Sequence, residues 1–457
     1  MQTQKQLVAK YGLFTAISMV VGQVIGSGIF FKVDDVLVST QGSALAGLLG
    51  FLIVGVSVIF ASISMANYAQ LIPKDGGILS YVDYRFGPKA AALVGWMYLT
   101  LFYPILTAVL FTVSGIYISH FLANFIEFIP NFLHYSLIGG INSLLFLSFN
   151  ILKPKSSGLF QQLTTVIKLI PLILIAALGI ISFGNDSTQA LQTLNNPISA
   201  ETVKPFWSLV AASFIPIAFA FDGWYIATQI SGEIKNARKN LPKALVIGAI
   251  IILVVYILYY LGIVLRMSPE SVIQFKDSYI IEYSKQLGSN LAALVMQLFI
   301  IISVLGTANG LMLASIRVPF QFYHLKSSRK FLSLGKINEK TGMPLKSAFF
   351  AYACILFYLF VYYLTNTLPF FKEINYDLSA IPVAFIYVVN GALFVGLVRI
   401  IKEGKLEGNK KIKYLLALFA LVGIIIVLTG TVLSDNGISY LLISAIFILS
   451  GLFFLRK

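Results

Sequence analysis

The sequence predicts an all-α polytopic membrane protein of twelve transmembrane helices, built as a 5+5 inverted repeat in which helices 1 and 6 are discontinuous. Composition is the first reason, because 58% of the 457 residues are hydrophobic and only 11% are charged, as is typical of membrane-spanning chains. The second is the recurrence of apolar segments of bilayer-spanning length along the chain. The third is a pair of interruptions that break the first and the sixth of these segments.

Twelve apolar segments are expected to cross the bilayer. Several exceed the ~20 residues that a crossing requires, so tilt or interruption is expected. The first span is expected to end in an outer turn at residues 31–35, and a short helix at 78–86 is expected to lie on the inner membrane surface. The predicted spans cover residues 11–38, 43–72, 90–119, 134–152, 159–183, 206–231, 242–265, 288–316, 346–365, 377–399, 414–433 and 437–455.

The positive charges follow the loops between these spans. With the N-terminus placed in the cytoplasm, 26 of the 33 Lys and Arg residues flank the inner side of the membrane and six flank the outer side, while Lys168 lies within a span. This bias is the positive-inside rule, and it predicts that both termini are cytoplasmic. The net charge of +15 therefore reflects membrane topology, and nucleic-acid binding is rejected.

Spans 1 and 6 each begin a set of five, and the loops place span 1 running outward and span 6 running inward. Interrupted helices at matching positions of two inverted halves are typical of secondary transporters, which bind substrate between the halves at the middle of the membrane. The predicted organisation is a first repeat at 1–183, an outer loop at 184–205, an inverted second repeat at 206–401 and two further spans at 402–457.

The first interruption is the run Ile25-Gly26-Ser27-Gly28 in span 1. Glycine weakens a helix, and backbone groups freed inside lipid are tolerated only where they are buried in protein or line a cavity. The half-helix that follows would turn its N–H groups and its positive dipole end toward that cavity, where a carboxylate could bind. The alternative is close packing of a neighbouring helix against small residues.

The second interruption, in span 6, reads Phe219-Ala220-Phe221-Asp222-Gly223. We expect the carbonyl groups of residues 219–221 to be freed there and to attract an ammonium group, as the carbonyl end of a helix does. Together the two breaks fit a zwitterion that is held by backbone groups. Phe219 is a candidate hydrophobic lid, with ordinary helix packing as the alternative.

Lys168 in span 5 and Asp222 in span 6 are the two ionisable residues deep within spans, where charges are costly and therefore usually functional. Lys168 is expected to cross-link carbonyl groups left free by a broken helix, to stand where a coupling ion would bind, or to exchange a proton. Asp222 is expected to bind a substrate amine or, alternatively, to cap the inner half of span 6 and serve as a gate.

Three further polar residues fall near these breaks. Thr307 and Asn309 in span 8 are expected to face Lys168 or to line the transport path, with packing among small residues as the alternative. Tyr103 is expected to line the substrate pocket, although tyrosines also gather at membrane interfaces.

The sequence points away from catalysis and metal binding. Cys354 is the single cysteine, and the three histidines lie near span ends without a carboxylate cluster. An enzyme would need a grouped nucleophile, base or metal site, and none is recognisable, so no catalytic residue, cofactor or metal site is expected. A channel would not need broken helices at matching places in two repeated halves.

Four runs in the right order resemble the amino acid–polyamine–organocation superfamily, and most of all the bacterial serine/threonine and alanine-serine-cysteine exchangers of its L-type amino acid transporter branch. The resemblance implies a leucine-transporter-like fold, with the substrate carboxylate on the Ser27 and Gly28 amides and the substrate amine on the carbonyl groups of 219–221. It also implies that Lys168 replaces a sodium site. The runs are Gly26-Ser27-Gly28-Ile29-Phe30, Lys168-Leu169-Ile170-Pro171, Phe219-Ala220-Phe221-Asp222-Gly223-Trp224 and Gly232-Glu233-Ile234-Lys235-Asn236.

The function that follows is sodium-independent exchange of small neutral L-amino acids, such as alanine, serine, threonine and cysteine, by alternating access. The alternative is a proton-coupled amino acid symporter with a broader or cationic substrate range. The expected location is the cell membrane, in a bacterium the inner membrane. Eukaryotic members of the branch join a glycoprotein through a cysteine between spans 3 and 4, and this chain has none there, so no disulfide-linked heavy subunit is expected.

Overall fold

The computed structural model describes residues 11–72, 77–185, 204–225, 227–228, 234–286, 289–324, 334–338, 342–374, 376–434 and 436–455. Within this part of the chain the structure is helical, and its β-structure is limited to one isolated bridge between Tyr11 and Ile234. The predicted all-α fold is therefore confirmed. Much of the outer loop at 184–205 and of the basic inner loop at 325–346 lies outside the described residues.

Ten helical segments of the described chain are long and apolar enough to cross a membrane. Some are single helices and others are interrupted by a break or a change of helix type. They are α1 (Leu13–Val24) with α2 (Ser27–Phe31), α4 (Ala44–Leu71), α6 (Pro88–Met97) with η1 (Tyr98–Phe102) and α7 (Tyr103–Leu122), α8 (Phe132–Leu152), α9 (Pro154–Ile167) with α10 (Leu169–Asn185), α14 (Ala237–Val264), α17 (Asn290–His324), α18 (Leu345–Thr367), α20 (Ala380–Lys402) and α21 (Lys410–Leu433).

Two shorter apolar segments occupy the remaining predicted spans. One is α12 (Phe206–Ala212) followed by α13 (Phe214–Ala220), and the other is α22 (Gly437–Leu455). Both coincide with sequence predictions, for spans 6 and 12. Because their apolar helical stretches, Phe206–Ala220 and Gly437–Phe453, are each shorter than 18 residues, the count of twelve crossings stays a prediction.

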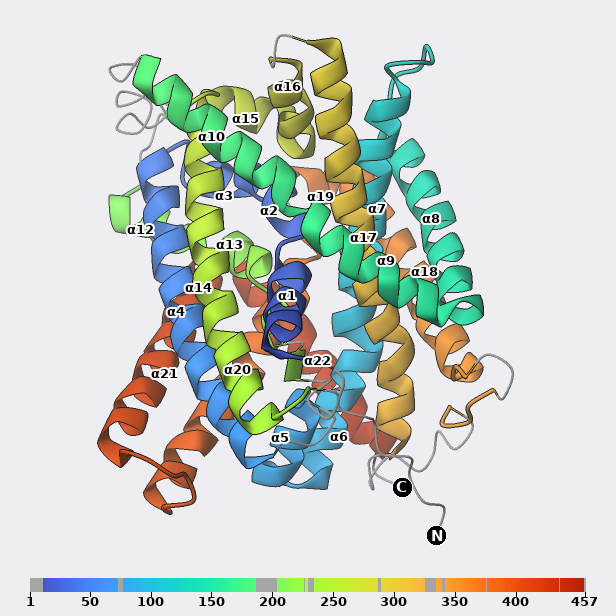
Figure 1. The fold of residues 1–457 in the computed structure, drawn as a ribbon. Coiled ribbons are helices and arrows are strands. Elements are labelled where there is room, and N and C mark those ends of the chain that lie inside the picture. The colour runs from blue at the N-terminus through green and yellow to red at the C-terminus, as the bar shows by residue number, and fades with distance from the viewer. Residues whose placement is uncertain are drawn as a thin grey trace.

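Short helices cover the two ends of the bundle (Figure 1). At one end lie α3 (Val33–Ser39), α15 (Pro269–Phe275), η3 (Lys276–Ser278), α16 (Tyr279–Lys285) and α19 (Pro369–Glu373). At the opposite end lies α5 (Gly77–Phe86), which agrees with the helix predicted at 78–86. The expected outer turn at 31–35 is wrong, because α3 follows α2 almost directly and Lys32 is the joint between them.

Two further irregularities interrupt long helices. Pro104 has no N–H group to donate to the preceding turn, and the backbone accommodates it with the π-helical segment η1 directly before α7. Lys168 stands alone between α9 and α10, so the fifth predicted span is also broken near its middle. In α14, α17 and α20 the helix continues for 23 to 35 residues without such a break.

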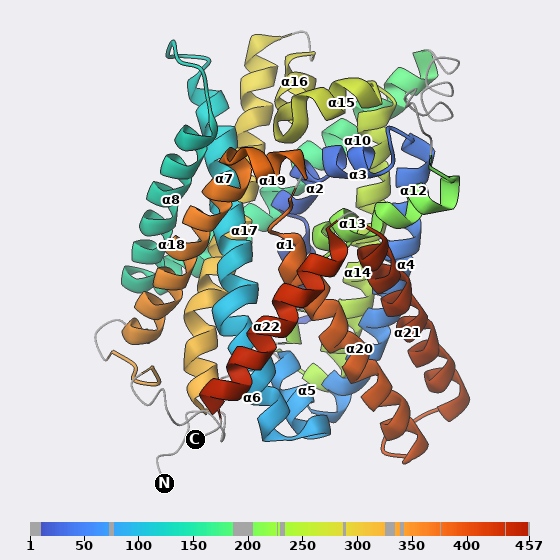
Figure 2. The same cartoon turned by 180° about the vertical axis from the view of Figure 1, so that it is seen from behind.

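The segments that carry the two predicted breaks lie inside the bundle, whereas α9 and α10 lie on its outside (Figure 1). In both views α1, α2 and α13 are near the middle and α21 lies at one side, while α22 crosses the face of the bundle that is seen in Figure 2. The peripheral helices expose large apolar side chains, as expected of surfaces that face lipid tails. Examples are Leu145 on α8, Phe360 on α18, Ile425 on α21 and Ile446 on α22.

Candidate functional site

The first predicted break lies between α1 and α2. The helix α1 ends at Val24, the N–H of Ile25 still donates to the carbonyl oxygen of Val21 at 2.7 Å, and Gly26 then turns the chain with φ −149° and ψ −137°. At the start of α2 the N–H groups of Ser27 and Gly28 precede any residue that could accept them within the helix. The backbone therefore directs the amino end of α2 at the break, as the sequence predicted.

The second predicted break follows α13. Phe221 donates its N–H to Ile217 at 3.1 Å, the N–H of Asp222 reaches back only to Phe219 at 3.0 Å, and residues 221–225 form turns. Gly223 has φ +96°, which side-chain-bearing residues rarely adopt. The glycine at this position is thus explained by the turn that ends α13.

The two breaks are in contact with each other. A methyl group added at Gly28 would lie 3.1 Å from the Cα atom of Ala220 and 3.5 Å from the Phe219 ring. One added at Gly26 would collide with the Thr307 side chain. The glycines of the first break therefore allow α2 to approach both α13 and α17.

A tyrosine that the sequence reasoning missed joins the two breaks. The hydroxyl of Tyr256, on α14, lies 2.8 Å from the carbonyl oxygen of Val24 and 2.9 Å from that of Ala220. One hydroxyl proton serves these two acceptors in turn. Nothing in the local sequence marks this residue, because Tyr256 is one of several tyrosines in a long apolar span.

This bond corrects one expectation about the second break. The carbonyl groups of Phe219 and Ala220 are not free in this conformation, since the first accepts the Asp222 N–H and the second faces Tyr256. The physical reason is that the chain closes into a tight turn and brings a buried hydroxyl against the helix end. The ring of Phe221 also contacts Tyr256, packing edge-on with the centroids 4.9 Å apart.

Lys168 is fully buried and lies beside the first break. Its Nζ atom donates to the carbonyl oxygen of Gly22 at 2.8 Å and to the hydroxyl of Thr307 at 2.8 Å. Gly22 belongs to the last turn of α1, whose carbonyl groups have no helical partner and attract positive charge. Lys168 therefore connects the end of α1 to α17 from the gap between α9 and α10.

Asn309 lies two residues from Thr307 but does not face Lys168. Its Oδ1 atom accepts hydrogen bonds from Asn150 at 2.9 Å and from Ser157 at 3.1 Å. Of the alternatives expected for span 8, facing Lys168 holds for Thr307, whereas Asn309 packs among the polar side chains of Asn150 and Ser157. The two residues point to different neighbours because positions two apart on a helix do not share a face.

Between the breaks lies a small cavity of about 40 Å³, called here the central cavity. Gly28, Phe219, Ala220, Asp222, Gly223 and Thr307 line it, as do Gln23, Val24, Phe102, Leu106, Leu110 and Leu311. The Asp222 carboxylate also accepts a hydrogen bond from Tyr225 at 3.1 Å. A capping role for Asp222 stays a prediction, because residues 221–225 form turns and the residue that follows them, 226, lies outside the described part of the chain.

Tyr103 does not contribute to this lining. Its ring packs edge-on against Tyr98 and Phe102, and the residue before it, Phe102, faces the central cavity instead. Leu106 and Leu110 continue the same face of α7 at intervals of four residues. The sequence prediction therefore identified the correct helical turn, but the residue that lines the cavity is Phe102 and not Tyr103.

Comparisons with known proteins identify a family and several relatives. A family model described as amino acid permease matches residues 11–454. The serine/threonine exchanger SteT of Bacillus subtilis (strain 168) is 26% identical, over 94% of this chain and 92% of its own length. The large neutral amino acids transporter small subunit 2 of Homo sapiens is 28% identical, over 83% and 69%. The b(0,+)-type amino acid transporter 1 of Mus musculus is 25% identical, over 98% and 87%.

A solved structure has a similar fold. The crystal structure of MhsT in complex with L-phenylalanine superimposes with a TM-score of 0.56 at 16% sequence identity, and the match covers 93% of this chain and 99% of that one. At this level of identity the likeness concerns the fold alone. It confirms the leucine-transporter-like arrangement around the two broken helices.

Proposed function

We propose that this chain, which belongs to the amino acid permease family, is a sodium-independent antiporter that exchanges small neutral L-amino acids by alternating access. Alanine, serine, threonine and cysteine are the proposed substrates. The broader assignment is given by the family: the chain is a multi-pass membrane transporter of amino acids and not an enzyme.

The position of Lys168 is the observation that carries the sodium-independent part of the proposal. Its ammonium group already supplies a positive charge to the carbonyl end of α1 and to Thr307. A cation bound there from solution would have to compete with a charge that is covalently part of the chain. Transport can therefore proceed without a sodium ion at this place.

Backbone groups are proposed to hold the substrate zwitterion. The first N–H groups of α2, at Ser27 and Gly28, suit the carboxylate, since they carry the positive end of the helix dipole. The carbonyl groups at the end of α13 suit the amine. Those of Phe219 and Ala220 already accept hydrogen bonds in this conformation, and a carbonyl oxygen can accept more than one.

The remaining residues of the central cavity would then determine which substrate side chains are accepted. Phe102, Leu106 and Leu110 present an apolar face opposite the breaks, and the cavity is small. A cationic side chain would be desolvated there at a cost unless Asp222 paired with it. A small neutral side chain incurs no such cost, which supports alanine-sized and serine-sized substrates.

A second candidate function rests on Asp222. Its carboxylate lines the central cavity, so it could pair with a cationic substrate or carry a coupled proton. That arrangement would make the protein a proton-coupled symporter with a broader substrate range.

Uptake of labelled serine into proteoliposomes tests both candidate functions. Exchange predicts equal uptake in sodium and choline buffers and weak inhibition by arginine and lysine. Inhibition by arginine as strong as that by alanine, or uptake driven by a pH gradient, would favour the symporter.

Membrane orientation and partner subunits are proposed from the charges and the cysteine content of the sequence. We propose cytoplasmic termini in the plasma membrane, in a bacterium the inner one, from the positive-inside charge bias. We also propose that no disulfide-linked heavy subunit is attached, because the single cysteine, Cys354, lies within α18.

A further inference from the structure

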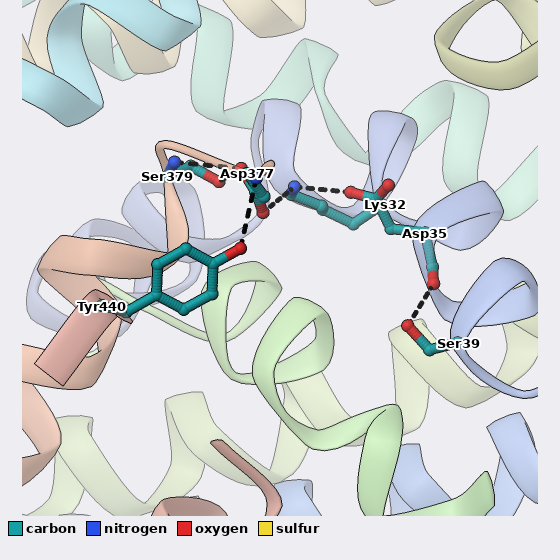
Figure 3. A network of polar contacts seen from close by, with 6 residues as sticks. All are labelled: Lys32, Asp35, Ser39, Asp377, Ser379 and Tyr440. Atoms are coloured by element: carbon teal, nitrogen blue, oxygen red, sulfur yellow. Dashed lines mark hydrogen bonds and ion pairs between the residues drawn. The ribbon is translucent and has the colours of Figure 1, made fainter. Parts of the chain in front are cut away.

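A buried cation outside the central cavity joins two distant parts of the chain. Lys32, at the joint between α2 and α3, is only 3% exposed. Its Nζ atom lies 2.6 Å from Oδ2 of Asp35, within α3, and 2.7 Å from Oδ2 of Asp377, 345 positions away between α19 and α20 (Figure 3). The first pair is local to one helix, whereas the second connects the outer half of span 1 to the start of α20.

Asp377 is held in place by its own surroundings. Its Oδ1 atom accepts hydrogen bonds from the N–H and the hydroxyl of Ser379, at 2.9 and 2.6 Å. Its backbone N–H donates to the hydroxyl of Tyr440, on α22, at 3.2 Å (Figure 3). These hydrogen bonds hold the Asp377 carboxylate in the orientation in which it meets Lys32.

Lys32 also contacts the aromatic residue that borders the substrate site. Its Nζ atom lies 5.1 Å from the centroid of the Phe219 ring, within the range of a cation–π interaction. Phe219 in turn lines the central cavity and is 7% exposed. One ammonium group thus connects α2, the segment before α20 and the lid of the cavity.

We propose that Lys32 is a positioning residue that closes the outer side of the site: it clamps α2 to Asp377 and holds Phe219 over the central cavity. The Lys32–Asp377 pair must then separate each time the site opens outward. A buried ion pair that loses one partner leaves an uncompensated charge, so removal of either residue destabilises the outward-closed state. The inference rests on the proposed alternating access, but not on which amino acid is carried.

Accessibility of a thiol in the central cavity tests the proposal without substrate or transport. The background is Cys354→Ala, which removes the single cysteine, combined with Leu110→Cys on the cavity face of α7. Intact cells are treated with a membrane-impermeant thiol reagent, and the rate of modification is measured. Lys32→Gln and Asp377→Asn are each expected to raise this rate roughly tenfold or more, while Lys32→Arg keeps it low because both ion pairs can reform.

Two matched control variants distinguish the long-range contact between Lys32 and Asp377 from a general effect of removing a charge. Asp35→Asn removes a carboxylate equally close to Lys32 but leaves the long-range pair intact, so the rate should change much less than with Asp377→Asn. Lys285→Gln removes the exposed pair with Glu282 and should change nothing. Folding of each variant is checked by its elution as a single peak in detergent. Equal rates in Lys32→Gln and the parent, or equal effects of Asp35→Asn and Asp377→Asn, would overturn the proposal.

Discussion

The Nζ atom of Lys168 lies 2.8 Å from the carbonyl oxygen of Gly22, so a positive charge inside the bundle meets the end of the first half-helix. The same atom binds Thr307 on α17. Three separate segments are therefore joined beside the central cavity by one side chain. Any movement of α1 relative to α17 during transport must rearrange these two hydrogen bonds.

Replacement of this lysine should slow turnover. Lys168→Ala leaves the Gly22 carbonyl and the Thr307 hydroxyl without this partner, at a cost on the order of 1–3 kcal/mol for a buried group. We expect a lower melting temperature in detergent, a reduced exchange rate and a changed ratio of substrate affinity at the two faces. Unaltered rate and unaltered sidedness would contradict the role given to Lys168.

Gly28 should tolerate no side chain. A Cβ atom there approaches Ala220 to 3.1 Å, and a larger group would fill the space proposed for the carboxylate. Gly28→Leu should abolish binding of labelled serine, whereas Gly140→Leu should preserve it, because a Cβ atom at Gly140 meets nothing within 4 Å.

Amino acid methyl esters, which lack the free carboxylate, should compete poorly with serine for binding to the parent protein. Strong competition by esters would remove the carboxylate from this site.

The polar contacts that surround these breaks were predictable to very different degrees. Gly26, Gly28 and Gly223 signal their breaks locally, because a glycine within an apolar span weakens the helix there. Lys168 was equally visible, as a lone charge in a span. Tyr256 was not, because its partners lie 36 and 232 positions away and only tertiary packing brings them together.

The contacts on the outer side of the site were also not predictable, because the residues that form them are distant in the sequence. Lys32 and Asp377 are separated by 345 positions, and the local sequence around Lys32 reads as a charged surface turn. Its burial depends on how α3 and the segment before α20 pack over it. The expectation that Tyr103 lines the pocket is wrong, because adjacent residues on a helix face different neighbours and Phe102 is the one that faces the central cavity.

The hydroxyl of Tyr256 should matter more than its ring. Tyr256→Phe keeps the packing against Phe221 but removes the hydrogen bond shared by Val24 and Ala220. The expected loss is about 1–3 kcal/mol for buried carbonyl groups left without this donor, with weaker serine binding. Tyr363→Phe, on α18, is the matched control. Unchanged affinity and melting temperature in Tyr256→Phe would show that the bond does not couple the breaks.

The charge of Asp222 separates the two candidate functions. Asp222→Asn retains the shape of the side chain and removes its charge. If backbone groups hold the zwitterion, serine exchange should continue at a rate close to that of the parent, since the substrate ammonium group then needs no ion pair with this residue. The measurement is exchange of labelled serine at two pH values. A complete loss of exchange, or a loss of pH dependence that the parent displays, would favour the symporter.

Efflux of labelled serine from proteoliposomes tests the central claim most directly. The vesicles are loaded with serine and diluted into buffer without amino acid, with alanine or with arginine, each in the presence and absence of sodium. Obligatory exchange predicts rapid efflux only into alanine, with or without sodium. Equally rapid efflux into empty buffer, or efflux that requires sodium, would contradict the claim.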